Sequence, residues 1–179
     1  CIAADKRPSA GTAADSDEAA MQEVEAKAVG QALIDAFPRA LKIMQSKNKD
    51  VPLHIACRYR TSIQVLTILV DANPQMSLFH TRWGKTPLVA LCDGFEQDDE
   101  ESDEEEKWGK MNVLLRGVAR AQNLVNQEGQ LLLVHAAVSL GSLGCPSQVL
   151  DQVLRRCHHQ VQEKDPLGRL PLHVATGKT

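Results

Sequence analysis

Large aromatic side chains are scarce in this chain. Phe, Tyr and Trp make up only 3% of its 179 residues, although 43% of the residues are hydrophobic. β-Sandwiches depend on aromatic and β-branched residues, so a composition rich in Leu, Val and Ala favours packed helices. No apolar run reaches the roughly 20 residues that a helix needs to cross a bilayer. The sequence therefore predicts an all-α protein that is long enough to have a core of its own.

The chain also lacks the residue patterns of the common catalytic and metal sites. Its five cysteines are odd in number and form no C-x-x-C pair, which argues against a disulfide framework and favours an intracellular location, cytoplasmic or nuclear. Cys157–His159 contains metal-ligand residue types, but adjacent residues at a helix end point in different directions. Gly177–Thr179 resembles the end of a phosphate loop, yet Leu172 stands where the first Gly is required. We therefore expect no enzymatic activity, metal, cofactor or small-molecule substrate.

Four segments spaced roughly 40 residues apart share one pattern, which is the signature of a repeat protein. Three of them have a Gly three residues before the aligned position, where a tight left-handed turn favours a residue without Cβ. Three have Pro at the aligned position, where its fixed φ suits the first turn of a helix. The segments are Val51–Cys57, Thr86–Cys92, Leu131–Ala137 and Leu170–Thr176; the glycines are Gly84, Gly129 and Gly168; the aligned positions are Pro52, Pro87, Leu132 and Pro171.

These segments resemble the ankyrin motif T-P-L-H-x-A, whose unit is a β-turn followed by two antiparallel helices. The first and fourth segments match it closely. Val89 replaces the motif His in the second unit, and the third unit lacks the Pro and has His135 displaced by one residue. The resemblance implies an ankyrin-type helix-turn-helix solenoid with short β-turn connections. It also implies that the motif His bonds between the turns of adjacent repeats, a role that we assign to His54 and His173.

The repeat pattern predicts a domain over residues 20–179 with about three full units and partial ends. Residues 1–19 are rich in Ala, Ser, Asp and Gly without periodicity, so we predict that they are disordered. Met21–Ala36 has apolar residues at helical spacing and either caps the array or links it to another domain. The chain starts at Cys1 and its last unit ends after one helix, so we expect a fragment or an array that continues. Second helices are expected at Ser62–Val70, Lys110–Leu115 and Ser147–Leu154.

An acidic stretch interrupts the second unit. Residues 93–107 carry ten acidic residues and one Lys, a net charge of −9, where a regular unit has a short turn. Like charges at this density repel each other and bury no apolar surface, so we predict a disordered insertion. Outside this stretch and residues 1–28, the chain carries 16 basic and 7 acidic residues, a net charge of +9. Either the insertion keeps the protein soluble, or it folds back on the basic body and screens it from acidic partners.

The resemblance places the partner surface on the turn tips and first helices, which form the concave face of ankyrin arrays. Arg82 and Trp83 lie at the second tip, and these residue types are enriched among the contacts that contribute most to binding. The alternative for Trp83 is packing against a neighbouring turn. Arg58, Tyr59 and Arg60 end the first helix and complete a basic, partly aromatic surface.

Together these features predict a non-enzymatic, monomeric scaffold that binds a protein partner on the concave face. Two alternatives stay open. The chain is the regulatory or targeting region of a larger enzyme or transcription-related protein, or its basic surface binds nucleic acid or an anionic membrane. Binding of the latter kind would depend steeply on salt, because it releases condensed counterions.

Overall fold

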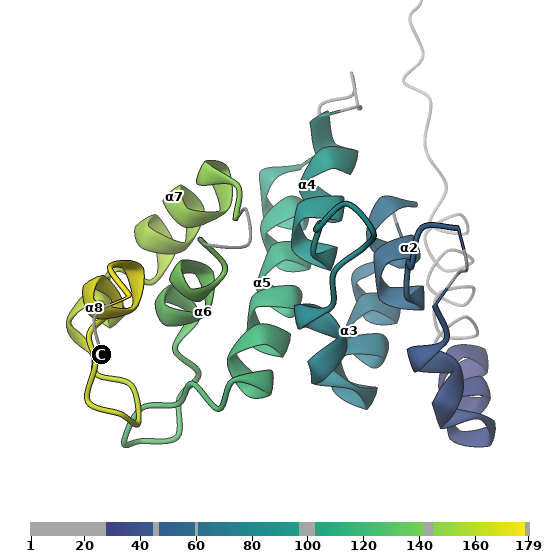
Figure 1. Cartoon of the computed structure of the whole chain (residues 1–179), viewed down its shortest axis with the longest axis horizontal. Helices are drawn as coiled ribbons and strands as arrows, with labels where there is room; N and C mark the ends of the chain where they lie inside the picture. The colour runs from purple at the N-terminus through teal and green to yellow at the C-terminus, as the bar shows by residue number, and fades with distance from the viewer. Residues whose placement is uncertain (1–27, 45–46, 60, 97–102, 142–144, 178–179) are drawn as a thin grey trace, which may run out of the picture.

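The chain forms an all-α structure in the computed structural model (Figure 1). Within the part that the structure describes there is no β-strand, and Val125 and Leu131 form an isolated antiparallel bridge. Each helix in that part is too short or too polar to cross a membrane. The described residues are 28–44, 47–59, 61–96, 103–141 and 145–177.

Four of the sequence-based predictions fall wholly or partly outside these ranges. The segment predicted to be disordered, residues 1–19, lies outside them. The predicted helix Met21–Ala36 is described only over residues 28–36, which are helical. Arg60, which we placed on the candidate surface, is also outside, as are residues 97–102 in the middle of the acidic stretch.

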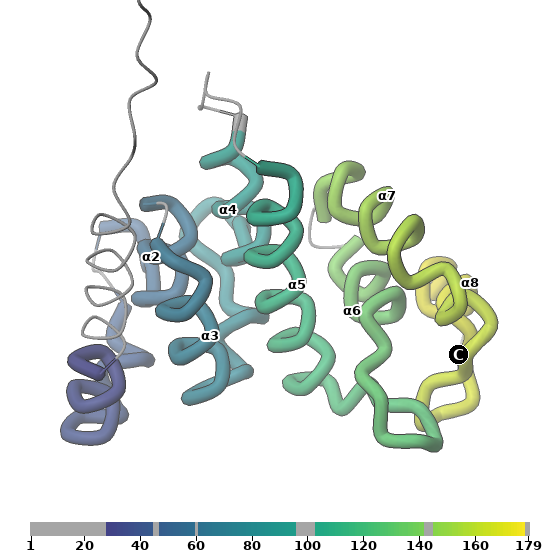
Figure 2. The backbone as a smooth tube through the Cα atoms, turned by 180° about the vertical axis from the view of Figure 1, so that it is seen from behind, coloured from purple at the N-terminus to yellow at the C-terminus, as the bar shows by residue number. Residues whose placement is uncertain are grey.

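Most of the helices form consecutive pairs, and the pairs lie side by side in a row (Figures 1 and 2). The 3-10 helix η1 (Pro38–Lys42) precedes the first pair, η2 (Pro74–Leu78) follows it, and η4 (His158–Gln162) follows the third pair. The pairs are α2 (Pro52–Arg58) with α3 (Ile63–Ala72), α4 (Pro87–Glu96) with α5 (Glu104–Ala121), and α6 (Leu133–Ser139) with α7 (Ser147–Arg156), and α8 (Pro171–Ala175) is the last described helix.

An aliphatic core joins the pairs. The first helices pack on each other at both ends of the row, α2 on α4 and α6 on α8, while the second helices α3 and α5 pack together in the first half. Fully burying a leucine side chain contributes about 1.5–3 kcal/mol, so these layers account for much of the stability of the row. The leucines that are less than 2% exposed are Leu66, Leu88, Leu114, Leu115, Leu132 and Leu140.

The long helix α5 is the element that connects the units. It contacts η2 and α3 of the first unit, α4 of its own unit and α6 of the third. It makes a close contact at Gly117, where a Cβ atom would overlap the Ser77 hydroxyl and would lie 2.7 Å from Cγ1 of Val70. Glycine is therefore required at this position for α5 to pack on the first unit.

The same left-handed turn precedes all four first helices. Gly84, Gly129 and Gly168 have φ angles of 75°, 80° and 78°. Lys49, which occupies this position in the first unit, has a φ of 58°. A residue with a Cβ in this region costs roughly 1–2 kcal/mol, because Cβ comes too close to the following carbonyl oxygen. The first unit thus keeps the turn at some cost in stability.

The third unit starts its helix one residue later than the sequence alignment places it. Proline is the first residue of α2, α4 and α8, but its aligned equivalent, Leu132, precedes α6, which begins at Leu133. The additional residue follows the bridge between Val125 and Leu131. His135 is therefore the third residue of α6, as His54 is the third residue of α2, so it occupies the position of the motif His in space.

The acidic stretch 93–107 is not a disordered loop throughout, which corrects the prediction from its charge. Helix α4 continues into it, and α5 begins at Glu104 rather than at Lys110. Asp103 caps α5, because its carboxylate accepts the backbone N–H of Glu105 at 3.1 Å. Acidic side chains are favoured in the first turn of a helix by the positive end of its dipole. The signals that start a helix therefore outweigh the repulsion between neighbouring carboxylates here.

Candidate protein-binding surface

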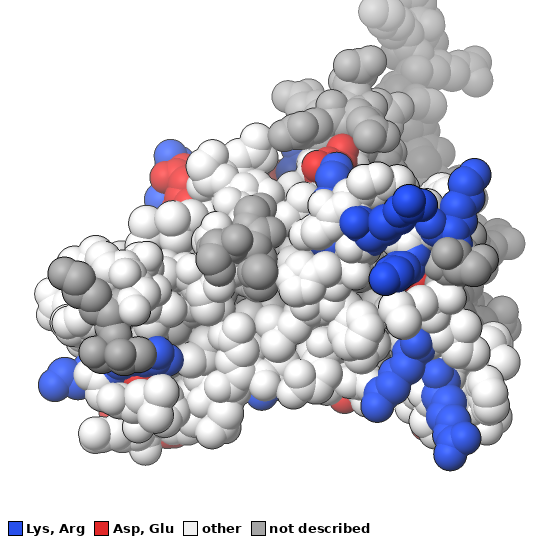
Figure 3. Space-filling view, in the orientation of Figure 1, with Lys and Arg blue, Asp and Glu red and all other residues white. Residues whose placement is uncertain are grey.

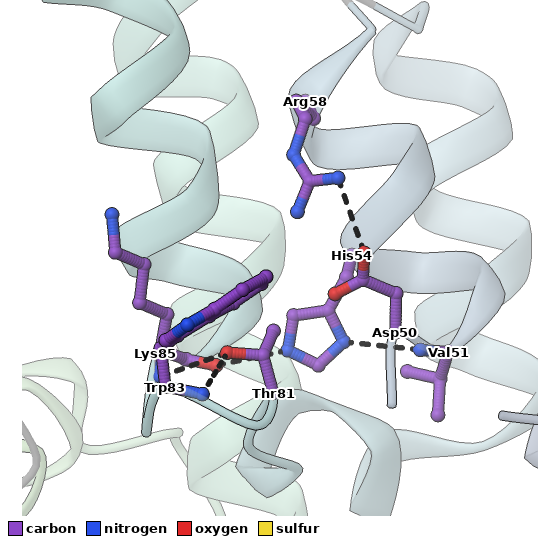
Figure 4. Close-up of polar contacts among 7 residues, drawn as sticks. All are labelled: Asp50, Val51, His54, Arg58, Thr81, Trp83 and Lys85. Atoms are coloured by element: carbon purple, nitrogen blue, oxygen red, sulfur yellow. Dashed lines mark hydrogen bonds and ion pairs between the residues drawn. The ribbon is translucent and has the colours of Figure 1, made fainter. Parts of the chain in front are cut away.

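The ring of His54 joins the first turn to the second (Figure 4). It is fully buried; its Nδ1 accepts the backbone N–H of Val51 at 3.4 Å, and its Nε2 lies 3.1 Å from the carbonyl oxygen of Lys85. These contacts require the neutral tautomer in which Nε2 donates. Burial lowers the pKa of His54 below its ordinary value, and the bond to Lys85 opposes this shift only in part. A neutral histidine thus fixes the spacing of the two turns.

The same contact recurs between the third and fourth turns, through His135. This side chain is fully buried, and its Nε2 lies 3.0 Å from the carbonyl oxygen of Arg169. His173, in contrast, is exposed on α8, and its Nδ1 accepts the N–H of Leu170 at 3.0 Å. No described repeat turn follows α8, so the inter-turn role of His173 stays a prediction. The inter-turn bond is observed at His54, as predicted, and also at His135, which the prediction did not include.

A buried ion pair orients Arg58 toward the first turn. The carboxylate of Asp50 is 0% exposed and lies 3.1 Å from the guanidinium of Arg58, whose side chain is 40% exposed. Arg58 ends α2 while Asp50 precedes it, so the arginine reaches back along the helix toward its first turn (Figure 4). Burying a carboxylate is unfavourable unless it is paired, so the ion pair with Arg58 offsets part of the cost of burying Asp50.

Backbone contacts bring together the tip of the first turn (Lys47–Lys49) and the tip of the second turn (His80–Trp83). The N–H of Arg82 donates to the carbonyl oxygen of Asn48 at 2.8 Å. The buried hydroxyl of Thr81 accepts the N–H of Trp83 at 3.3 Å and that of Lys85 at 3.2 Å. The backbone that carries the side chains of the second tip is therefore held in place by hydrogen bonds to the first turn and to Thr81.

The predicted surface residues that the structure describes all lie exposed in this region. Trp83 is 63% exposed and Tyr59 is 71% exposed, so neither ring packs fully against a neighbouring turn. Arg58 and Arg82 are exposed as well. The structure brings Arg82 and Trp83 to the contact between the first two tips, and it places Arg58 and Tyr59 at the end of the adjacent helix α2.

The charge of this end of the row is strongly positive. Residues 36–92 contain eight Lys and Arg and two Asp, a net charge of +6. Both aspartates are paired with arginine, Asp50 with Arg58 and Asp71 with Arg120. The space-filling view shows Lys and Arg side chains gathered on the half of the face that carries α2, while the other half is mostly uncharged (Figure 3). Within residues 36–92 the basic groups thus face no unpaired carboxylate.

Two carboxylates of the acidic stretch, Glu104 and Glu105, contact the third unit. Both terminal nitrogens of Arg156 donate to the carboxylate of Glu105, at 3.2 and 2.8 Å. The guanidinium of Arg156 also lies 5.1 Å from the centre of the Trp108 ring. Glu104 accepts from the side chain of Gln152 at 3.1 Å. These contacts join the start of α5 to α7, on the opposite side of α5 from the basic tips. Asp93 is different, since it pairs with Lys85 at 2.6 Å.

Gln160 has a structural role that sequence analysis missed. It is 6% exposed; its side-chain oxygen accepts the N–H of Leu133 at 2.8 Å and that of Val134 at 3.3 Å, and its side-chain nitrogen donates to the carbonyl oxygen of Leu131 at 3.1 Å. It thereby caps the start of α6 from the following segment. The ankyrin motif carries no signal for this glutamine, because its partners are distant in sequence.

The thiols and the Cys157–His159 segment are the remaining reactive side chains among the described residues. Burial raises the pKa of Cys57 well above its ordinary value and that of Cys145 to about 11, so these thiols stay protonated at neutral pH. The described part of the chain has no group of three metal-ligand side chains, Cys157–His159 included. A shallow groove of about 580 Å³ beside α5 contains Arg116 and Arg120 but no nucleophile or acid–base pair.

Comparison with protein-family models, curated proteins and solved structures gives no match. The function is therefore inferred from the geometry of the chain. Its main features are the linked turns, the exposed rings of Tyr59 and Trp83, and the positive charge around them.

Proposed function

We propose that this chain is an ankyrin-type repeat domain that binds a protein partner and has no catalytic activity of its own. The family assignment is supported by the left-handed residue at the same place in all four turns. It is also supported by the helix pairs that follow these turns and by the buried histidine that bonds to the next turn in the first and third units. Repeat arrays of this kind expose an extended concave face to a partner.

The observation that carries the binding function is the exposure of Trp83 on a fixed backbone. An indole that is 63% exposed leaves a large apolar area in water, and tryptophan is among the residues that contribute most to protein interfaces. Its turn is held by Thr81 and by the bond between Arg82 and Asn48. Little backbone order is lost on binding when the contact residues are already in place, so more of the contact energy appears as affinity.

A non-enzymatic function agrees with the use of the buried polar groups. His54, Thr81, His135 and Gln160 all bond to backbone groups at turns or helix starts, where they support the fold. A catalytic centre needs a nucleophile, acid or base directed into a pocket that a substrate can enter. The described pockets contain a thiol, Cys145, whose raised pKa of about 11 keeps it protonated, and a carboxylate, Asp71, that is paired with Arg120. We therefore interpret the buried polar residues as structural.

Affinity capture tests the proposed function. The wild-type chain and the double variant Arg82→Ala/Trp83→Ala would be immobilised and exposed to lysate, and the bound proteins would be quantified by mass spectrometry. Leu167→Ala is the matched control, because Leu167 is 75% exposed in the fourth turn. Circular dichroism would verify that all three proteins remain helical.

We expect partners that bind the wild type and the Leu167→Ala control and are lost from the double variant. Removing such an anchor typically costs at least 2 kcal/mol, which is roughly thirtyfold in affinity. Equal capture by the double variant and the wild type would contradict the surface that we propose.

A further inference from the structure

The first two turn tips carry cations that the described fold does not use. Lys47, Lys49 and Arg82 are exposed and form no ion pair with another described residue. Arg58 and Lys85 lie in the same region but already pair with Asp50 and Asp93. An array of unpaired cations beside exposed rings is costly to bury against an apolar partner, because each cation would lose its hydration.

We propose that the partner contributes a short acidic segment, with Asp or Glu beside an apolar residue, that binds across the first two turn tips. This inference rests on the proposed function and specifies its ligand. The carboxylates would pair with Arg82, Lys47 and Lys49, and the apolar side chain would pack on the Trp83 ring. A guanidinium can hold a carboxylate with two parallel hydrogen bonds, so Arg82 supplies direction as well as charge.

The geometry of the tips fits a short segment. The 2.8 Å bond between Arg82 N–H and the Asn48 carbonyl places two neighbouring backbones in contact, so the cations on both sides of Asn48 lie close to Arg82. Trp83 follows Arg82 directly, which puts the apolar contact next to the strongest carboxylate ligand. A ligand needs to span only these two tips to meet all of these groups.

The charge of the rest of the chain argues against a long polyanion. The sequence changes from a net charge of +6 over residues 36–92 to −9 over residues 93–107. The described carboxylates Asp103–Glu106 are exposed at the start of α5. A nucleic acid or an anionic membrane presents negative charge over an area much larger than two turn tips, so the acidic stretch would weaken its attraction to the chain. A short acidic segment avoids these carboxylates, so the charge pattern favours a peptide ligand.

Fluorescence provides a direct test, because Trp83 is exposed whereas Trp108 is only 8% exposed. The probe is a capped synthetic peptide in which Asp-Glu pairs flank leucines, compared with the same peptide carrying Asn and Gln. Each would be titrated into the full chain while the tryptophan emission is recorded. We expect the acidic peptide to shift the emission and the neutral peptide to leave it unchanged.

Charge reversal distinguishes a specific site from general attraction. We expect Arg82→Glu and Lys47→Glu each to weaken the acidic peptide at least tenfold at low salt. Lys164→Glu, an equal charge change on an exposed residue of the fourth turn, should have less than a twofold effect. Equal losses in all three variants would overturn the proposal, since net charge alone would then explain binding.

Three further measurements would also decide the inference. Tighter binding of single-stranded DNA or of phosphatidylserine vesicles than of the acidic peptide would overturn it. Self-association in analytical ultracentrifugation that Arg82→Glu abolishes would likewise overturn it, in favour of a second copy as ligand. If the peptide fails while affinity capture still depends on Arg82 and Trp83, the acidic ligand is wrong and the proposed binding function stands.

Discussion

The first and third units are joined to the next turn by a buried histidine, whereas the second unit is joined by different contacts. His54 and His135 bond to the carbonyl oxygens of Lys85 and Arg169. In the second unit Val89 stands at this position, and the hydroxyl of Thr86 accepts its N–H at 3.3 Å. The link to the third unit comes instead from packing of α5 on α6 and from polar contacts of α5 with α7.

The two histidines also differ from each other. His54 has a partner for each ring nitrogen, while Nδ1 of His135 is buried and has no partner in the described part of the chain. The third unit has a longer connection between its glycine and its helix, and there Gln160 binds the backbone N–H groups at the helix start. The comparison teaches that one residue inserted in a turn transfers the capping of a helix from its own histidine to a distant side chain.

Removing the histidine rings should give the largest effects. We expect His54→Ala to lower the free energy of unfolding by about 2–4 kcal/mol, because it leaves a cavity and two backbone groups without partners. His135→Ala should cost less, about 1–3 kcal/mol, because only one nitrogen loses a bond. Urea unfolding followed by circular dichroism measures both. His173→Ala is the exposed control and should change the value by less than about 0.5 kcal/mol; an equal loss in His173→Ala and His135→Ala would show that the bond of His135 to the next turn adds no stability.

Acid should weaken the bond between His54 and the second turn. The unfolded chain binds a proton to this histidine more readily than the folded chain, because burial lowers the pKa of His54 in the fold. Its contribution is therefore present above its ordinary pKa of 6.5 and is lost as the pH falls toward the lower folded pKa. We expect the stability difference between wild type and His54→Gln to shrink between pH 7.5 and 5.5 in unfolding experiments. A constant difference over this range would count against a neutral His54.

The link between the second and third units should respond to the loss of charge at Arg156. Arg156→Met keeps most of the aliphatic side chain but removes the pair with Glu105 and the contact with Trp108, so we expect a loss of about 0.5–1.5 kcal/mol. Arg155→Met is the control, since that arginine is 71% exposed and pairs only within α7. Thermal unfolding at low and high salt would measure both variants. Equal losses would show that α5 and α7 are held together by other contacts.

The turn of the first unit should gain stability from a glycine. Lys49 adopts a φ that the glycines of the other turns adopt at little cost, so Lys49→Gly should raise the free energy of unfolding by up to about 1 kcal/mol. Lys47→Gly removes the same charge nearby and should give no such gain. A loss of stability in Lys49→Gly would mean that the lysine side chain contributes more than its backbone conformation costs.

Local sequence signals predicted the elements that depend on local chemistry. Pro52, Pro87 and Pro171 begin helices, and the three glycines adopt positive φ angles, because both preferences belong to a single residue. The register of the third unit was missed because Leu132 was aligned with the prolines, although the displacement of His135 by one residue marks the additional residue before α6. The start of α5 was missed because repulsion between carboxylates was weighted above the cap at Asp103 and the helix dipole.

The candidate surface was predictable in part, because the exposure of a residue follows from its own position in the repeat. Exposure of Arg58, Tyr59, Arg82 and Trp83 followed from their positions in the repeat. The contacts that orient them did not, since Asp50 binds Arg58 across a helix and Asn48 binds Arg82 from another turn. Such pairs depend on how units stack, and composition and spacing say little about which buried polar groups will meet.

Helix α5 has a mechanical consequence for the row. It is the longest described helix, with 18 residues, and it contacts the first unit on one side and the third on the other. A force that pulls the ends of the row apart therefore passes through α5, where the close contact at Gly117 resists sliding against Ser77 and Val70. The short helices at each end offer less resistance, so stretching would detach the outer units and leave the middle of the row as the last part to extend.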